Sequence, residues 1–409
     1  MALEPQSVKS RSRHRARRQP FSWKAKLIAG AVGLLLVWQT SVISLAAGHG
    51  DYGDDIKAAD YASVSPAAAA AAAGQRLTDG DFDGAKAFAT RALSVSPISA
   101  DSLRDLGLAK QGLNDWQGSG AIFSQAAALG WHDVPTQLWL AQAFLQQKDY
   151  EAASQRLDAA LRTTPNSTRL YDIVDRLAAT PQFVRPMADR LALNPDWRPY
   201  YFAHVDSVSK TSLLARSQLL IALSTSPLPP SRQEVIPILF HLIYEDETPL
   251  ARLLWLRSQH LKTGNIYDPN FTQTGTIGLT PFEWSITSVP GATFSAVQRG
   301  PDTIMHAGTD GTASGILLRQ ATALPSGAHK LNYVGSIPSA ARDAFGWRVR
   351  CIRTGKILLS SLGTLAPPPY SFEVPVNCVG QWVELLASTS ASAAGSEATF
   401  KSLNIDYPS

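Results

Sequence analysis

Three patterns of apolar and polar residues follow one another along the chain. Residues 27–47 carry no charge. From residue 66 to 262, apolar residues recur at three- and four-residue steps, which predicts amphipathic helices. Residues 271–409 form short alternating runs; in "WRVRC" the Trp, Val and Cys share one face and the two Arg the other. We therefore expect an α + β multidomain protein, with helices followed by strands.

The uncharged stretch 27–47 is long enough to cross a bilayer, because a helix of this length spans about 30 Å. Residues 1–26 carry eight Lys or Arg and one acid. Positively charged flanks stay in the cytoplasm, so the sequence predicts a single-pass membrane helix at 27–47 with a cytoplasmic tail at 1–26. A cleaved signal peptide is the alternative, because Ser44-Leu45-Ala46 has the small-x-small pattern of a cleavage site.

A period of 34 residues runs through the first predicted helices. Five columns keep this step: Ala73, Gly107 and Ala141; Ala85, Ser119 and Ala153; Ala89, Phe123 and Leu157; Ala92, Ala126 and Ala160; Pro97, Trp131 and Pro165. The segment 65–165 therefore resembles three tetratricopeptide repeats (TPRs), with Trp131 as a departure from the helix-stopping proline. This resemblance implies a helical solenoid that binds proteins. We expect a linker at 48–64 and further helical hairpins at 166–264.

The stretch "DGDFDGAK" (79–86) matches the opening of a calcium-binding EF-hand loop. The repeat explains it differently, because Gly80 falls at the turn between two helices of the first repeat. An EF-hand also needs an acid at loop position 12, and Thr90 stands there. We expect a turn and no metal site, and no cofactor elsewhere.

The register of the repeats predicts a partner-binding face on the first helix of the second and third repeats. Its residues are Asp101, Arg104, Leu108, Gln111, Leu138, Gln142, Leu145 and Gln146. The set is polar with apolar interruptions, which suits a peptide or protein segment. A solvated groove without a partner is the alternative.

The predicted strands of 265–409 have no helix between them, which favours an antiparallel β-sandwich. Cys351 and Cys378 are the two cysteines of the chain, and outside the cytoplasm they predict one disulfide. The runs "NFTQTG…PFEWSI" and "FKSLNID" resemble those of jelly-roll, galactose-binding-like carbohydrate-binding modules. The resemblance implies a ligand-binding sandwich, with Trp284, Tyr370 and Trp382 as candidate glycan-facing rings.

Catalytic and nucleic-acid-binding functions find little support. The chain lacks a phosphate-binding loop, a G-x-S-x-G elbow and H-E-x-x-H, so we expect no enzyme. Glu283 is the one acid of the sandwich that we would name for glycoside cleavage. The formal charge of +4 includes +7 from residues 1–26, so the remainder sums to −3 (4 − 7) and does not suit nucleic acid.

These observations predict a non-catalytic scaffold anchored in a bacterial inner membrane, with most of the chain in the periplasm. A TPR scaffold joined to a sugar-binding fold resembles components that organise bacterial exopolysaccharide assembly or export. The resemblance implies a solenoid that holds partner proteins and a sandwich that contacts a glycan. Two alternatives stay open. One is a structural subunit of another membrane complex, in which the sandwich packs on protein. The other is a degenerate carbohydrate-active enzyme.

Overall fold

The computed structural model describes residues 65–406 except 206–207, 263, 274–278 and 301, together with isolated positions between 34 and 60. The predicted cytoplasmic tail lies outside these residues, as do the predicted membrane helix and linker apart from those isolated positions. Within the described residues, no helix is both long enough and apolar enough to span a membrane. The chain divides into two compact units, Met1–Gly130 and Trp131–Ser409.

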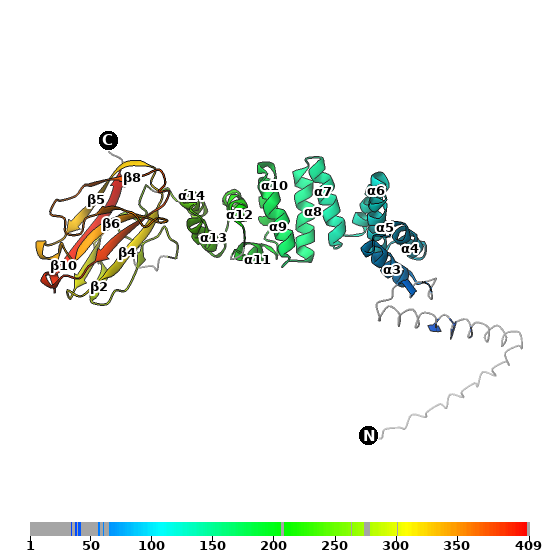
Figure 1. Cartoon of the computed structure of the whole chain (residues 1–409), viewed down its shortest axis with the longest axis horizontal. Coiled ribbons are helices and arrows are strands. Elements are labelled where there is room, and N and C mark those ends of the chain that lie inside the picture. The colour runs from blue at the N-terminus through cyan, green and yellow to red at the C-terminus, as the bar shows by residue number, and fades with distance from the viewer. Residues whose placement is uncertain are drawn as a thin grey trace, which may run out of the picture. The chain divides into compact units, whose positions relative to one another are not determined.

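The first unit contains four described helices that pair as two hairpins (Figure 1): α3 (Pro66–Thr78), α4 (Phe82–Val95), α5 (Ala100–Gly112) and α6 (Trp116–Leu129). Small side chains fill its core, among them Ala73 and Ala89, which are fully buried. A methyl group on Gly107 would lie 2.9 Å from the ring of Phe123. This close approach explains why the repeat column at Gly107 requires a small residue.

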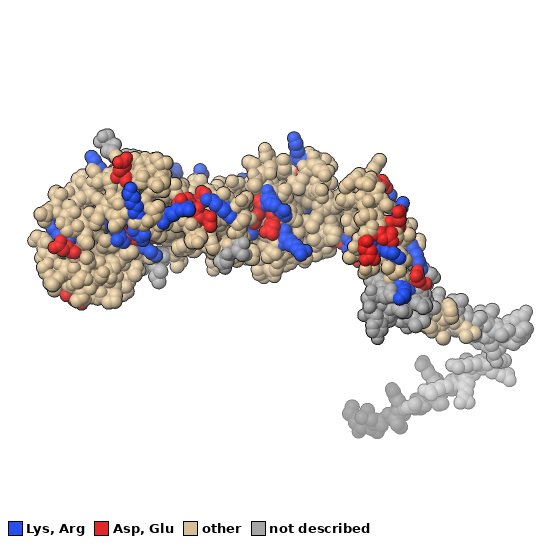
Figure 2. Space-filling view, viewed as in Figure 1, with Lys and Arg blue, Asp and Glu red and all other residues tan. Residues whose placement is uncertain are grey.

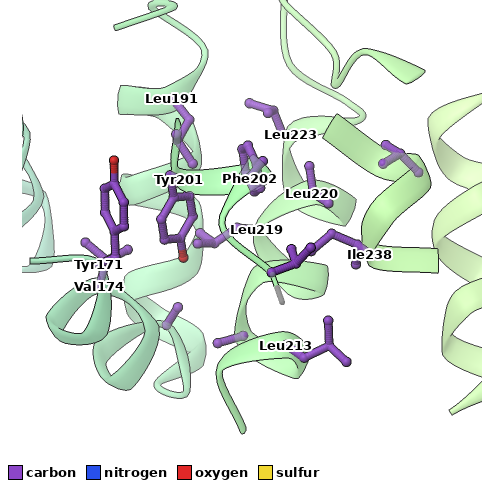
Figure 3. Packing of buried hydrophobic residues seen from close by; sticks show 14 of the residues in the cluster. Tyr171, Val174, Leu191, Tyr201, Phe202, Leu213, Leu219, Leu220, Leu223 and Ile238 are labelled. Carbon is purple, nitrogen blue, oxygen red and sulfur yellow. The ribbon is translucent and has the colours of Figure 1, made fainter. Parts of the chain in front are cut away.

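The second unit begins with eight helices: α7 (Val134–Gln146), α8 (Tyr150–Thr163), α9 (Thr168–Ala178), α10 (Pro181–Leu191), α11 (Arg198–Ala203), α12 (Lys210–Leu223), α13 (Arg232–Tyr244) and α14 (Thr248–Ser258). Large side chains build their core. Figure 3 shows Tyr171 of α9, Tyr201 and Phe202 of α11, and Leu220 of α12 converging on one cluster. Trp197 and Trp255 are also buried there.

The helix starts repeat with the same 34-residue step. Each of the following N-cap side chains accepts a hydrogen bond from the backbone N–H three residues later: Ser65, Ser99, Asp133 and Ser167 on α3, α5, α7 and α9; Asp81, Asp115 and Asp149 on α4, α6 and α8. The sequence predicted three repeats that end at residue 165, but the N-cap at Ser167 shows that the 34-residue period continues into α9.

The same caps explain "DGDFDGAK". Asp81 caps α4 by accepting from the Gly84 N–H at 2.9 Å, and Gly80 takes a positive φ of 77° in the turn before it. Asn114 and Lys148 occupy the same turn position in the next two repeats, also with positive φ. The acidic stretch is therefore a helix–turn–helix junction.

Two buried ion pairs hold the later helices together. Arg216 of α12 donates to Asp175 of α9 at 2.9 Å, and the Tyr201 hydroxyl donates to the same carboxylate. Arg198 of α11 donates to Glu234 of α13 at 2.9 Å and to the Leu191 carbonyl at 3.0 Å. The short helix α11 is thus fixed by hydrogen bonds to α10 and α13.

The C-terminal strands form two five-stranded antiparallel sheets. One contains β1 (Ser285–Ile286), β4 (Gly315–Thr322), β9 (Gln381–Ala387), β6 (Phe345–Cys351) and β7 (Ile357–Ser360), in that order. The other contains β2 (Ala292–Arg299), β3 (Asp302–Thr309), β10 (Glu397–Asp406), β5 (Gly327–Ser336) and β8 (Tyr370–Val374). Residues of both sheets share one buried cluster, so the sheets face each other as a sandwich. A short 3₁₀ helix, η1 (Ser339–Ala341), precedes β6.

The helices and the sandwich of the second unit share a core. Phe282 and Ala321 are buried in the helical cluster, and Phe282 lies 5.4 Å from the Trp255 ring of α14. A side chain at Gly380 would collide with Thr248, at the start of α14. The boundary near residue 265 is therefore a change of secondary structure without a gap in the packing.

Candidate functional site

The predicted partner-binding residues of α5 lie along one side of the helix. Asp101 is exposed, whereas Arg104, Leu108 and Gln111 are partly exposed. Arg104 donates to Asp101 at 2.8 Å and to Asp105 at 2.9 Å. This side of α5 therefore offers a charged pair followed by an apolar and an amide side chain.

The predicted residues of α7 divide into two kinds. Gln142 and Gln146 are exposed, whereas Leu138 and Leu145 are partly buried against the helical core. The leucines therefore stabilise the packing of α7, and the glutamines are the groups that a partner would reach.

A pocket of about 260 Å³ lies beside Trp131, on α8 and α10 of the second unit. Trp131 is 47% exposed, and the Arg156 guanidinium lies 4.2 Å from the centroid of its ring. Exposed Trp and Arg side chains are the residue types that dominate protein-binding energies. In the repeat pattern Trp131 is only a departure from the proline column, but an aromatic residue at a turn is also a signal for such a surface.

A larger cleft of about 430 Å³ opens on the sandwich. Three segments line it: the end of β5 from Tyr333 to Ile337, the residues Arg342 and Phe345 around the start of β6, and the connection from Ser361 to Tyr370. We call it the tyrosine cleft. The two sheets each contribute strand residues, because β5 and β8 belong to one sheet and β6 to the other.

The walls of the tyrosine cleft combine aromatic rings with hydroxyl groups. The Tyr333 and Tyr370 rings lie 6.4 Å apart, and the Tyr370 hydroxyl donates to the Ala366 carbonyl at 3.1 Å. Burial raises the pKa of Tyr333 well above its ordinary value, and the neighbouring Tyr370 raises it further. The Tyr333 hydroxyl therefore stays protonated at neutral pH and acts as a neutral hydrogen-bonding group.

The other two candidate rings are placed differently. Trp284 is only 3% exposed, and its indole N–H donates to the Asp268 carbonyl at 3.0 Å. This corrects the expectation that Trp284 faces a glycan, because its ring belongs to the sandwich core. Trp382 is partly buried against the helical core, and the Arg319 guanidinium covers its ring at 4.8 Å. Of the three rings, Tyr370 is the one that lines a cleft.

Sequence reasoning missed Tyr333 and Arg342. Tyr333 could have been found in "HKLNYVGSI", because strand alternation places it on the same face as Leu331. Arg342 stands in the turn before β6, where no periodicity marks it.

The predicted disulfide is confirmed: Cys351 at the end of β6 is bonded to Cys378, with 5.5 Å between the Cα atoms. Glu283 binds Arg232 of α13 at 2.8 Å and accepts from two backbone N–H groups. It therefore helps to join the sandwich to the helices.

Within the described part of the chain, no three His, Cys, Asp or Glu side chains gather as a possible metal site.

Charged side chains on the visible face lie in small groups of mixed sign (Figure 2). On the sheet containing β6, Glu384 is fully buried and accepts from Arg348 at 2.8 Å and Arg350 at 2.9 Å. These arginines, which alternate with core residues in "WRVRC", thus form an ion-pair network on the outer face of the sheet.

Fold and surfaces together define a helical-repeat protein that carries a β-sandwich. The family model for the tetratricopeptide repeat matches residues 108–177, so the chain contains tetratricopeptide repeats. The match reaches into α9, in agreement with the fourth N-cap at Ser167. A tetratricopeptide fold implies protein partners in general. No curated protein matches the chain.

Several solved structures are similar to parts of the chain. One is described as accessory secretory protein 1, 2 and 3 in Streptococcus pneumoniae, with 15% identity, TM-score 0.24, and coverage of 36% of this chain and 99% of the other. Another is pilF of Pseudomonas aeruginosa, with 18% identity, TM-score 0.31, and coverage of 55% and 92%. A third is a tetratricopeptide repeat protein from Parabacteroides merdae, with 12% identity, TM-score 0.29, and coverage of 55% and 94%. TM-scores this low carry no functional argument.

Proposed function

We propose that this protein is a non-catalytic scaffold whose tetratricopeptide helices bind a partner protein and whose sandwich binds a glycan in the tyrosine cleft. In this proposal residues 27–47 anchor it in a bacterial inner membrane, and the folded units lie in the periplasm. The corresponding process is the assembly or export of an exopolysaccharide.

The tyrosine cleft is the observation that carries the glycan part. Its volume of about 430 Å³ lies in the usual range for small-ligand sites, roughly 300–1,000 Å³. Sugar rings present apolar C–H faces and a rim of hydroxyl groups. Tyr333 and Tyr370 offer aromatic surface for those faces, and Ser336 and Thr364 offer hydrogen bonds to those hydroxyls.

Two surfaces support the protein-binding part. One is the side of α5 that carries Arg104 and Gln111. The other is the pocket beside Trp131, where an exposed indole and a stacked arginine provide the anchors that protein interfaces favour. The first lies on the first unit and the second lies on the second unit, so each can be tested separately.

Glycan binding can be tested on the full chain in detergent. A panel of bacterial and commercial oligosaccharides is titrated by calorimetry against the wild type and Tyr370→Ala. We expect the variant to bind at least tenfold more weakly, because it loses a stacking surface. Tyr244→Ala is the matched control, because Tyr244 of α13 is 83% exposed and lies outside the cleft. A wild type that binds none of the panel contradicts this part of the proposal.

Protein binding can be tested by mild crosslinking of intact cells, affinity capture and mass spectrometry. One comparison variant carries Arg104→Glu, a second carries Gln142→Glu, and a third carries Trp131→Ala. Polysaccharide synthase or export proteins that are captured by the wild type and lost in a variant would support the assignment. Capture of an unrelated membrane complex would remove the polysaccharide part and leave a scaffold.

A further inference from the structure

We infer that the tyrosine cleft selects an acidic sugar and that Arg342 binds the sugar's carboxylate. This inference rests on the glycan-binding function proposed above and adds the chemical class of the glycan.

The charge of the cleft points to an anionic ligand. Arg342 is the one cation among the residues that line it, and no lining residue is an acid. Among the described residues, no carboxylate pairs with the Arg342 guanidinium. Three other arginines of the sandwich pair with carboxylates: Arg348 and Arg350 bind Glu384, and Arg353 binds Asp246 at 3.3 Å. The lining of the cleft therefore carries one positive charge and no negative one; the neighbouring Asp343 carboxylate lies beside Gly363, outside the lining.

The backbone of Arg342 is held in place. The residue directly follows η1, and its carbonyl accepts from the Gly363 N–H at 2.9 Å. Gly363 has a positive φ of 72°, a conformation that glycine adopts without strain. This bond ties the arginine turn to the connection that forms the opposite wall of the cleft. The Arg342 side chain therefore extends from a backbone that is fixed relative to this wall of the cleft.

Arg342 acts on the same space as the tyrosines. Arg342, Tyr333 and Tyr370 all line the cleft, and the guanidinium charge offsets part of the rise in the pKa of Tyr333. A sugar stacked on Tyr333 or Tyr370 would thus present its substituents to Arg342.

A guanidinium distinguishes a uronate from a neutral sugar by its hydrogen-bond geometry. It forms two parallel charge-assisted N–H···O bonds with a carboxylate, and these are roughly twice as strong as neutral ones. A neutral hexose presents a hydroxymethyl group at the same ring carbon, which accepts at most one weaker bond. The partly enclosed cleft screens the charge less than open water does. The arginine should therefore favour the uronate.

The test uses matched pairs of oligosaccharides: galacturonate with galactose, glucuronate with glucose, and mannuronate with mannose oligomers of equal length. They are titrated by calorimetry against the full chain in detergent at low salt. We expect at least one uronate oligomer to bind about tenfold more tightly than its neutral partner. Added sodium chloride should shrink that preference, because salt screens charge pairs.

Arg342→Gln should bring the two affinities of each pair to within about twofold, chiefly because the uronate binds more weakly. Arg299→Gln is the matched control, because Arg299 of β2 is exposed and outside the cleft, and it should keep the preference. Equal affinities in the wild type, or a preference that persists in Arg342→Gln, would overturn the inference.

The outcomes also separate this inference from the proposed function. Tyr370-dependent binding of neutral and acidic sugars with equal affinity would remove the acid selectivity and leave the glycan function. Failure of every oligosaccharide to bind would remove both.

Discussion

The repeated helices α3–α8 and the later helices α9–α14 solve the same packing problem with different residues. In α3 and α4, alanines fill the core, and Ala73 and Ala89 are fully buried. In α9–α14, the core holds Trp197, Tyr201 and Trp255 together with the ion pair of Arg216 and Asp175. The small side chains of the first region allow its helices to approach closely. The core of the second region contains large rings, and the polar groups buried with them form hydrogen bonds and ion pairs.

This difference shows which interactions determine the fold of each region. The repeated helices are defined by local features, namely N-caps and small residues that recur every 34 positions. The later helices depend on contacts between distant residues, such as Arg198 with Glu234. A buried charge costs several kcal/mol when its partner is removed, whereas a local cap contributes about 1 kcal/mol. Substitutions in the two regions should therefore differ in the size of their effects.

The largest effect should come from Asp175→Ala, which leaves Arg216 buried without its carboxylate. We expect a loss of about 3–5 kcal/mol in the free energy of unfolding. Urea denaturation followed by tryptophan fluorescence measures it, because Trp197 lies in this core. Asp172→Ala is the matched control, since Asp172 is exposed on the same helix. Similar stabilities of the two variants would show that the ion pair does not hold the later helices.

Reduction of the bond between Cys351 and Cys378 should have the next largest effect. The two residues are 27 positions apart, so the chain-entropy relation gives a loss of about 3.5 kcal/mol. Denaturation with and without a thiol reductant measures this loss, and a Cys351→Ser, Cys378→Ser variant should be insensitive to the reductant. An unchanged midpoint in the wild type after verified reduction would contradict the expectation.

Ala89→Leu tests the alanine core of the first unit. Ala89 is fully buried, and added methyl groups in a filled core cost about 1–3 kcal/mol. Ala87→Leu on the exposed side of the same helix should change stability by less than about 0.5 kcal/mol. Thermal unfolding followed by circular dichroism compares them. Equal midpoints would mean that the small residues leave empty space, and the distinction between the two cores would weaken.

The smallest effect concerns a single cap. Asp115 accepts from Lys110 at 2.7 Å and from the Gly118 N–H at 2.9 Å, and these bonds lower its pKa below the ordinary 3.8. A lowered pKa in the folded state stabilises the protein above the unfolded pKa, and this stabilisation disappears as the pH falls through the folded pKa. We expect Lys110→Ala to raise the pKa of Asp115 toward 3.8 in an NMR titration. An unaltered pKa would assign the shift to the backbone bond alone.

The sequence predicted the repeated region and the disulfide best, because both leave local or compositional marks. The columns at Gly107 and Ala89 follow from helix crossings, and their period is visible in the chain itself. The prediction that Trp284 is exposed was wrong. Strand alternation shows which residues share a face, but it does not show whether another segment of the chain covers that face. Arg342 could not be predicted as a cleft residue. It lies in a turn, and the other residues that line the cleft come from segments that are distant in the sequence.

The helices of the second unit and the sandwich are joined by a shared hydrophobic core. Phe282 and Ala321 sit in the helical cluster, and Arg232 holds Glu283 across the same joint. A fragment cut at residue 265 would expose apolar surface at both ends and should be poorly soluble. A pulling force applied to α13 or α14 would be transmitted to the strands through these contacts.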